Sequence, residues 1–405
     1  MLKHYRVIDL TDEKGFLCGK ILGDLGADVI KVEKPSGDPA RRIGPFYNNT
    51  SDPEKSLHWF AFNSSKRGIT LNLETSEGQE IFRKLSDGAD VVIESFPPGY
   101  MQRLGLGYSE LSASNPRLIM TSITPFGQTG PYKDDKASDI TLLAMSGLMR
   151  INGDSDKPPL RMCLDQSYYL ASAHAAVGTF LAFHHRVTSG EGQHVDVSIY
   201  ECAVRANYRE PVRWEHEKAL GHRMGNLFPW GRIPRCQLWP CKDGYVTWMI
   251  MPENPKATRA FIEWIEEEGK VGTWKGVKDD ASLLKLTQDD LSSLEGMIGK
   301  FISTHTIEEL ETASVTKGLL LSPVNNVDGV AKDENLVSRG YWKEIEHPEL
   351  GVAITYPGFT FLSDGVENRI RFRAPLIGEH NQEIYGEELG FTKEMISTLT
   401  KRGVI

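Results

Sequence analysis

Asp165 stands directly before a long helical pattern, and its residue type and position allow two kinds of role. The run that follows is rich in serine, alanine and glycine, and it gathers an apolar stripe at helical spacing from Leu170, Val177, Leu181 and Phe183. An aspartate at a helix start commonly accepts hydrogen bonds from free backbone N–H groups, and this cap is the better interpretation for the stretch alone. A carboxylate held there in one rotamer would also suit a nucleophile.

Six cations lie in segments rich in glycine and proline, each just after a predicted strand. They are Lys34, Arg41, Arg42, Arg103, Lys133 and Lys136. Open α/β sheets bind ligands at the carboxyl ends of their strands, so these side chains could gather around a phosphorylated ligand. The alternative for each residue is a solvated loop charge. Because the chain is acidic overall, six cations gathered at one edge of the sheet are less easily explained as solvated loop charges than any one of them would be.

The elements that would position these residues alternate between strand and helix. Tyr5–Leu10 and Ala27–Val32 have strand patterns around a helical pattern at Gly15–Leu25, which predicts a βαβ unit. Further strands are predicted at Ile69–Leu73, Asp90–Glu94, Leu118–Ile123 and Gly192–Ile199, with helices at Ser76–Leu85 and Ser109–Ser114. This order predicts an α/β fold with a parallel sheet that is covered on both faces.

The first turn lacks the glycine fingerprint of a dinucleotide site, because Gly15 and Gly19 are its only candidates. A nicotinamide dehydrogenase is therefore not expected.

The composition changes after the charged segment that ends near Asn226. Tryptophan and proline cluster there, and Cys241–Gly244 predicts a turn between two strands. Helical, charged sequence follows to about Gly318. We interpret this region as a second, smaller α+β domain whose tryptophans mainly build a core. The last part of the chain has the pattern of a loop and a terminal helix at the surface.

The overall composition indicates a globular enzyme. The chain has 405 residues, a formal net charge of −9, 40% hydrophobic residues and 25% charged residues. The acidic balance disfavours binding to nucleic acid or to an anionic membrane. Five widely spaced cysteines predict neither disulfides nor a zinc site, and no metal site is expected. The amino terminus carries no signal-peptide pattern and no apolar run approaches membrane-spanning length, so a cytoplasmic location is expected.

Five motifs in order resemble the class III coenzyme A transferases, the family of formyl-CoA transferase, carnitine CoA-transferase and the α-methylacyl-CoA racemases. They are DLGADVIKVEKPSGDPAR from Asp24, NSSKRGITLNL from Asn63, DVVIESFPPGYMQRLGLGYSEL from Asp90, NPRLIMTSITPFGQTGPY from Asn115 and GEGQHVDVSIYECA from Gly190. The similarity covers roughly the first half of the chain and reappears in APLIGEHNQEI from Ala374.

The resemblance implies a Rossmann-like large domain built from both ends of the chain, with a small domain between them. On this basis we expect residues 1–204 in the large domain, a linker at 205–228, the small domain at 229–320, a second linker at 321–348, and a return to the large domain at 349–405. Family members form interlocked dimers with the active site at the subunit interface. A homodimer is expected here, and a heteromer with a paralogue is the alternative.

The resemblance also implies site residues. The catalytic aspartate of the family falls on Asp165. The contacts to coenzyme A fall on Glu13, Lys34, Leu71, Glu74, Ser95, Phe96, Arg103, Leu104 and Lys136. Lys34 replaces a frequent arginine, Ser95 replaces an asparagine, and Glu74 stands where a lysine is common, which reverses a charge on the adenine-ribose side.

The chemistry of an aspartate then predicts a CoA transferase that works through covalent intermediates. Asp165 would attack a donor acyl-CoA and form an aspartyl anhydride, then an aspartyl-CoA thioester that an acceptor carboxylic acid resolves. CoA and acyl-CoA are substrates, and no tightly bound cofactor is expected. Water must be excluded from the anhydride. The segment GHRMGNLFPWGRIPRC has no glycine run, so we expect a different closing element and a larger, less polar acyl group, with Trp230 and Trp239 as wall residues.

Two alternatives stay open. A racemase of the same family needs a histidine at the position that Ser138 occupies, which disfavours racemization. A noncatalytic subunit of a heteromeric transferase would have no chemical use for Asp165.

Overall fold

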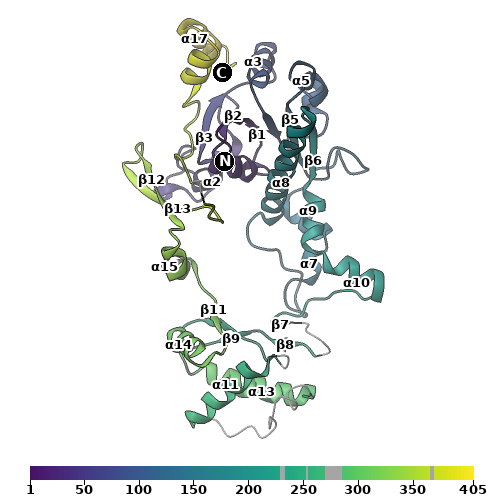
Figure 1. The fold of residues 1–405 in the computed structure, drawn as a ribbon, viewed down its shortest axis with the longest axis vertical. Helices are drawn as coiled ribbons and strands as arrows, with labels where there is room; N and C mark the ends of the chain where they lie inside the picture. Colours follow the sequence, from purple (N-terminus) through teal and green to yellow (C-terminus); the bar gives the residue numbers. More distant parts are fainter. Residues whose placement is uncertain (229–232, 252–253, 270–284, 365–368) are drawn as a thin grey trace. The chain divides into compact units, whose positions relative to one another are not determined.

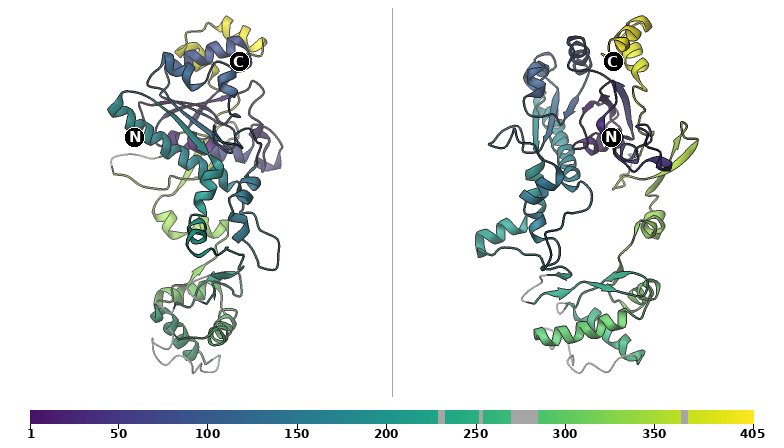
Figure 2. Two further views of the ribbon diagram at one scale, coloured as in Figure 1. Left: turned by 90° about the vertical axis from the view of Figure 1, so that its right-hand side faces the viewer. Right: turned by 180° about the vertical axis from the view of Figure 1, so that it is seen from behind.

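The computed structural model describes residues 1–228, 233–251, 254–269, 285–364 and 369–405, which form two compact units (Figures 1 and 2). Unit 1 combines Met1–Met149, Arg161–Leu220 and Val337–Ile405, so both ends of the chain contribute to it. Unit 2 consists of Arg150–Leu160 and Gly221–Leu336. Trp230, one of the two expected wall residues, lies outside the described residues.

Unit 1 is built on a parallel sheet whose strand order, among the described residues, is β3-β2-β1-β4-β5-β6. The strands are β1 (Arg6–Leu10), β2 (Asp28–Glu33), β3 (Lys66–Thr70), β4 (Val91–Glu94), β5 (Ile119–Thr124) and β6 (His194–Ser198). The order reverses between β1 and β4, which is the arrangement of a doubly wound, Rossmann-like sheet. The predicted α/β fold class is confirmed.

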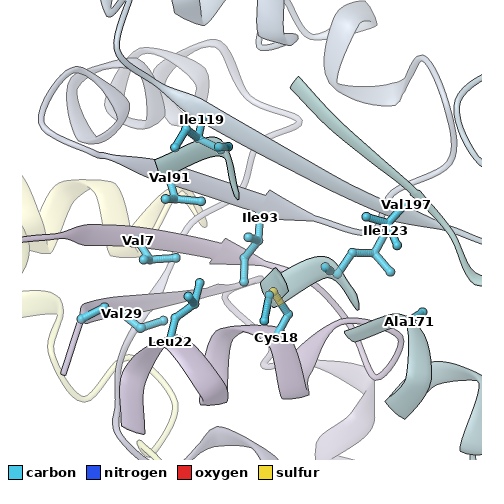
Figure 3. Close-up of a cluster of buried hydrophobic side chains, with 14 of the residues drawn as sticks. Val7, Cys18, Leu22, Val29, Val91, Ile93, Ile119, Ile123, Ala171 and Val197 are labelled. Atoms are coloured by element: carbon cyan, nitrogen blue, oxygen red, sulfur yellow. The ribbon is translucent and has the colours of Figure 1, made fainter. Parts of the chain in front are cut away.

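Helices cover both faces of this sheet, because alternate strand residues point to opposite sides. Val7 belongs to a buried cluster with α1 (Phe16–Asp24) and α8 (Gln166–Ser189), whereas its neighbour Ile8 packs with α3 (Ser76–Asp87). Figure 3 shows the first cluster, in which Cys18 and Leu22 of α1 lie beside strand residues.

Strand β3 begins at Lys66, three residues before the predicted start at Ile69, and it ends at Thr70. The strand start carries a lysine that is fully buried, which the hydrophobic pattern could not indicate. The Lys66 ammonium donates to Asp9 Oδ2 at 2.8 Å, so the charge is paired inside the unit. Leu71 to Leu73 therefore follow the strand and stand at its carboxyl end.

Helix α8 buries its small residues and only part of the predicted apolar stripe. Ala171, Ala175 and Ala182 are buried, whereas Val177 and Leu181 are exposed to 56% and 65%. Small side chains let the helix lie close to the sheet and to α1. Of the predicted stripe, Phe183 is buried and Leu170 is partly buried, so the stripe is confirmed for these two residues only.

The C-terminal segment is part of unit 1, and its last helix, α17 (Lys393–Lys401), has the predicted surface character, with no buried residue. Ile384 and Tyr385 are fully buried, and the Tyr385 hydroxyl donates to the carbonyl of Thr70 at 2.6 Å. The backbone N–H of Asn72 donates to the carbonyl of Val404. The end of the chain thus packs beside β3, as all views of the yellow segment agree (Figures 1 and 2).

Unit 1 contains further helices and a separate two-stranded hairpin outside the six-stranded sheet. They are η1 (Pro39–Arg42), η2 (Tyr47–Asn49), α2 (Leu57–Asn63), α4 (Tyr100–Arg103), α5 (Tyr108–Ser114), α6 (Asp139–Met145), α7 (Leu148–Ile151), α9 (Ile199–Ala206), α10 (Arg209–Glu217), β12 (Trp342–His347), β13 (Val352–Pro357), η3 (Gln382–Glu388) and α17 (Lys393–Lys401). Helix α7 reaches two residues into the range assigned to unit 2. Helix α10 lies within the segment 205–228, where the sequence showed no strong period.

Unit 2 has its own aromatic core. The strands are β7 (Leu227–Phe228), β8 (Arg235–Cys236), β9 (Leu238–Pro240), β10 (Tyr245–Thr247) and β11 (Ser322–Pro323), and the helices are α11 (Pro255–Glu267), α13 (Gln288–Ile302), α14 (Ile307–Lys317), α15 (Val327–Lys332) and α16 (Glu334–Ser338), the last of which ends two residues inside unit 1. Strands β9 and β10 form the predicted hairpin. Trp239 is 5% exposed and its indole N–H donates to the carbonyl of Trp248, so it is a core residue and the expectation of a wall was wrong.

Candidate active site

Asp165 occupies the N-cap position of α8, but its carboxylate makes no capping hydrogen bond. Instead, Nη2 of Arg161 donates to Asp165 Oδ1 at 2.8 Å. The Asp165 side chain is 37% exposed, so it remains accessible to a ligand. The preceding residue, Leu164, has a positive φ of 61° and its carbonyl also accepts from Arg161.

Asp139 provides the cap that Asp165 does not provide. It is the first residue of α6, and it is only 3% exposed. The backbone N–H and the hydroxyl of Ser167 donate to Asp139 Oδ1 at 2.9 and 2.7 Å, while Nε of Arg161 donates to Oδ2 at 3.0 Å. Because Asp139 satisfies the helix start, the capping interpretation is wrong for the Asp165 carboxylate, which stays free for other contacts.

The Asp165 charge acts on two nearby rings, His58 of α2 and Tyr169 of α8. The Tyr169 ring stacks on Phe62 with 5.2 Å between centroids, and Phe62 lies 5.0 Å from the His58 ring. Burial lowers the pKa of His58, although the negative charge of Asp165 opposes the shift. The buried Nε2 of His58 has no hydrogen-bond partner among the described residues. Helix α2, which carries His58, is about a hundred residues away in sequence, so no local pattern linked His58 to Asp165.

A pocket of about 190 Å³ lies at the carboxyl ends of β1 to β4. Ligands of doubly wound sheets bind at this edge, where the strand order reverses. Five residues that the resemblance assigned to coenzyme A line the pocket, and they are Lys34, Leu71, Glu74, Ser95 and Phe96. Asp12 and Tyr100, which the sequence did not single out, also line it.

The four other assigned residues are not among those that line the pocket. Glu13 directly follows Asp12, and burial together with the Asp12 charge raises the pKa of its carboxyl group. The Arg103 guanidinium lies 5.7 Å from the centroid of the Tyr100 ring, and Leu104 packs with the hydrophobic cluster near Phe96. Lys136 is exposed in the loop before α6.

The six cations expected around a phosphorylated ligand are not all available for it. Arg41 is 1% exposed, and its guanidinium pairs with Glu33 at 2.6 Å and with Glu54 at 2.7 Å. Lys133 pairs with its exposed neighbour Asp134. Arg41 is therefore a structural residue beneath the pocket, and Lys34 is the one cation among the pocket-lining residues described.

Buried charges fix the pocket floor from below. Asp9 accepts from the backbone N–H of Thr11 at 2.9 Å and from Lys66 at 2.8 Å. Burial alone would raise the pKa of Asp9, but the ammonium groups of Lys66 and Lys31 outweigh it and lower the pKa. Lys31 donates to the carbonyl of Thr11 at 2.5 Å. The Thr11 backbone at the pocket edge is thus held by the Asp9 carboxylate and the Lys31 ammonium group.

Glu94 holds the pocket wall at the end of β4. Its Oε2 accepts from the backbone N–H of Phe96 at 2.7 Å, and its side chain is 3% exposed. Burial raises the pKa of Glu94 to about 7, although hydrogen bonds to Ser122 and Phe96 oppose the shift. The neighbouring Ser95 hydroxyl exchanges hydrogen bonds with Asp12 from the β1 side of the pocket.

No group of three or more His, Cys, Asp or Glu that could hold a metal ion occurs among the described residues. In the same part of the chain, no helix is both long enough and apolar enough to cross a membrane.

Comparison with solved structures gives the class. A CaiB/BaiF family protein from Brucella suis has the same fold, with a TM-score of 0.80, 26% sequence identity, and coverage of 95% of this chain and 98% of the other. The model of CoA-transferase family III matches residues 2–381, so the chain belongs to this family.

Two curated relatives cover nearly the whole chain. The succinyl-CoA:(R)-benzylsuccinate CoA-transferase subunit BbsE of Thauera aromatica is 34% identical over 405 residues, which are 99% of this chain and 97% of the relative. The succinyl-CoA–D-citramalate CoA-transferase of Chloroflexus aurantiacus is 30% identical over 395 residues, which are 96% and 94% of the two chains. The chain is accordingly a family III acyl-CoA:carboxylate CoA-transferase, as the resemblance predicted.

Proposed function

We propose that Asp165 is the nucleophile of the transfer. One carboxylate oxygen attacks the thioester carbonyl of the donor acyl-CoA, expels the CoA thiolate and forms an aspartyl acyl anhydride. The thiolate then attacks the aspartyl carbonyl, which releases the donor acid and leaves an aspartyl-CoA thioester. The acceptor carboxylate attacks this thioester to give a second anhydride. Attack of the thiolate on the acceptor carbonyl forms the product acyl-CoA and frees Asp165.

The observation that carries this proposal is the state of the Asp165 carboxylate. It is accessible, it is held at a helix start by Arg161 at 2.8 Å, and the capping task has passed to Asp139. A nucleophile needs such a fixed geometry without loss of its free oxygen. The positive end of the α8 dipole adds stabilisation for negative charge at this position.

Coenzyme A is proposed to lie in the pocket at the strand ends. The proposed contacts are Glu13, Lys34, Leu71, Glu74, Ser95, Phe96, Arg103, Leu104 and Lys136. Support comes from the five of them that line one pocket at the strand-order reversal, where a nucleotide-bearing ligand is expected.

Succinyl-CoA is the proposed donor, and a dicarboxylic acid with an apolar substituent is the proposed acceptor. The names of both curated relatives reported above contain succinyl-CoA, and one of them names the aryl-substituted acid benzylsuccinate. The aromatic side chains of Phe62 and Tyr169 near Asp165 provide apolar surface for such an acceptor.

A dimer is the proposed catalytic unit, because the anhydride must be shielded from water while Asp165 is exposed in the single chain. Val177, Leu181 and Val187 of α8 are exposed to 56%, 65% and 77%, so this helix presents an apolar face. A second copy of the chain is proposed to cover it. The name of the Thauera relative calls that protein a subunit, so a heteromer with a paralogue is the alternative.

The test is a trapping experiment with purified protein and [¹⁴C]succinyl-CoA. Hydroxylamine should convert an Asp165 thioester into a hydroxamate at that peptide, and mass spectrometry should locate it. Asp165→Asn should abolish both the adduct and CoA exchange with added acids. Exchange that survives this substitution would sink the mechanism. Solvent deuterium entering the acyl chain without exchange would favour a racemase, and exchange only after addition of a paralogue would favour the heteromer.

A further inference from the structure

The pocket at the strand ends carries an unusual charge balance for a polyanionic ligand. Its lining includes four carboxylates and one ammonium group, and these belong to Asp12, Glu33, Asp38, Glu74 and Lys34. Three of the carboxylates are matched by cations outside the lining. Glu33 pairs with Arg41 at 2.6 Å, Asp38 with Lys31 at 3.7 Å, and Asp12 with Lys14. In the described part of the chain, Glu74 has no ion pair.

Glu74 has an aromatic partner instead of a cation. The Tyr100 hydroxyl donates to Glu74 Oε1 at 2.5 Å, and the Tyr100 ring lies 4.5 Å from the Phe96 ring. Burial and the hydrogen bond to Glu74 raise the pKa of Tyr100, so its hydroxyl stays a donor. The second carboxylate oxygen of Glu74 remains free to accept a hydrogen bond from a ligand.

A carboxylate beside two aromatic rings can bind the adenine of coenzyme A, but it repels the phosphate groups. The adenine amino group can donate to Glu74, and the base can contact the rings of Phe96 and Tyr100. A phosphate group at this place would face the Glu74 charge and would be repelled. Lys34 is the one cation among the described lining residues and suits the diphosphate. The Arg103 guanidinium lies outside the lining, 5.7 Å from the centroid of the Tyr100 ring.

We propose that Glu74 makes this chain indifferent to the 3′-phosphate of coenzyme A, with the adenosine bound beside Glu74, Phe96 and Tyr100 and the 3′-phosphate directed away from the pocket. The enzyme then accepts 3′-dephospho-CoA thioesters as readily as CoA thioesters. This inference rests on the proposed role of the pocket in CoA binding, and it is independent of the covalent chemistry at Asp165.

The test compares binding of free CoA and free 3′-dephospho-CoA to the full-length protein by isothermal titration calorimetry. Direct binding needs neither an acyl donor nor the Asp165 nucleophile, so failure of the covalent mechanism would leave this readout intact. Wild type should bind the two compounds within threefold of each other. Glu74→Lys should shift the ratio at least tenfold in favour of CoA, and Glu74→Gln should shift it less. Glu74 is exposed, so both variants should fold.

Tyr100→Phe serves as the matched variant, because it removes the hydroxyl donor while Glu74 keeps its charge. It should leave the ratio within threefold of unity. Wild-type preference for CoA above threefold would overturn the proposal. An unchanged ratio in Glu74→Lys would overturn the assignment to Glu74, and failure of both compounds to bind would overturn the assignment of the pocket.

Discussion

The Arg161 guanidinium joins two carboxylates of different exposure, Asp165 at the surface and Asp139 in the interior. Its Nη2 lies 2.8 Å from Asp165 Oδ1, and its Nε lies 3.0 Å from Asp139 Oδ2. The planar fork of an arginine can hold both partners at once, which a lysine cannot do. The buried carboxylate therefore fixes the cation that fixes the proposed nucleophile.

Arg161→Met should lower kcat of CoA transfer by about 10²-fold with a small change in KM, because a misplaced nucleophile loses its reactive geometry. Arg161→Lys should recover part of the loss, since it restores the charge but not the fork. Initial rates of CoA exchange, followed by chromatography of the acyl-CoA products, measure both constants. Arg209→Met, on the exposed face of α10, is the matched control and should behave as wild type. Equal kcat values for Arg161→Met and the control would contradict the positioning role.

Asp139→Ala should destabilise the protein by about 1–3 kcal/mol, because it leaves the donors of Ser167 and Arg161 without their buried acceptor. The start of α8 loses its cap at the same time. Ser167→Ala removes the Ser167 hydroxyl, one of the donors to Asp139, so its cost should be smaller, about 1 kcal/mol. Urea denaturation followed by far-UV circular dichroism measures the free energy of unfolding. Equal stability of Asp139→Ala and wild type would show that another group caps the helix.

The general architecture could be predicted from sequence because it depends on local periodicity. Strands β1, β2, β4 and β5 each contain two or more consecutive apolar residues, and the βαβ order restricts the topology. The exceptions have a physical cause. Lys66 starts a strand although it is charged, because Asp9 on a different strand neutralises it. Val177, Leu181 and Val187 of α8 face outward, because small residues such as Ala171 and Ala175 fit against the sheet.

The candidate site was predictable only in part, because its parts come from distant segments. The family resemblance assigned a catalytic role to Asp165 and coenzyme A contacts to the pocket residues, and these roles are proposals. The role of Asp139 depends on α6 approaching the start of α8, and the position of the partly buried His58 ring depends on α2. Arg41 shows the opposite case, in which a motif cation is fully engaged by Glu33 and Glu54. The roles of these side chains depend on tertiary contacts, which cannot be inferred from the spacing of residues along the chain.

Lys66→Met should destabilise the protein by about 3–5 kcal/mol, since it leaves the Asp9 carboxylate buried without its closest cation. Both side chains are fully buried, so solvent cannot replace the lost partner. The paired substitution Asp9→Leu with Lys66→Met should recover much of the loss, because replacing a whole buried ion pair is often neutral. Guanidinium denaturation of the single and double variants gives the free energies of unfolding, and from these the coupling energy between Asp9 and Lys66. A double variant no more stable than the single one would show that the pair does not act as a unit.

Glu94 should make the stability of the protein fall as pH rises through neutrality. Its pKa is about 7 in the folded chain and 4.5 as the ordinary value, so the folded state binds more protons than the unfolded state between these limits. The stabilising contribution is complete below about pH 4.5 and is lost as pH rises through 7. A shift of this size corresponds to about 3 kcal/mol.

Glu94→Gln is the variant that isolates this effect, because a neutral amide can still accept from the N–H of Phe96. Other groups near Glu94 carry charge, including Asp12 and Asp196, so wild type and variant must be compared at each pH. His194 bonds to the same Ser122 hydroxyl, and burial lowers the pKa of this histidine. We expect the difference in free energy of unfolding, variant minus wild type, to grow by about 3 kcal/mol between pH 4.5 and pH 8. Urea titrations at four pH values measure it, and a difference that stays constant across this range would refute the assignment of the transition to Glu94.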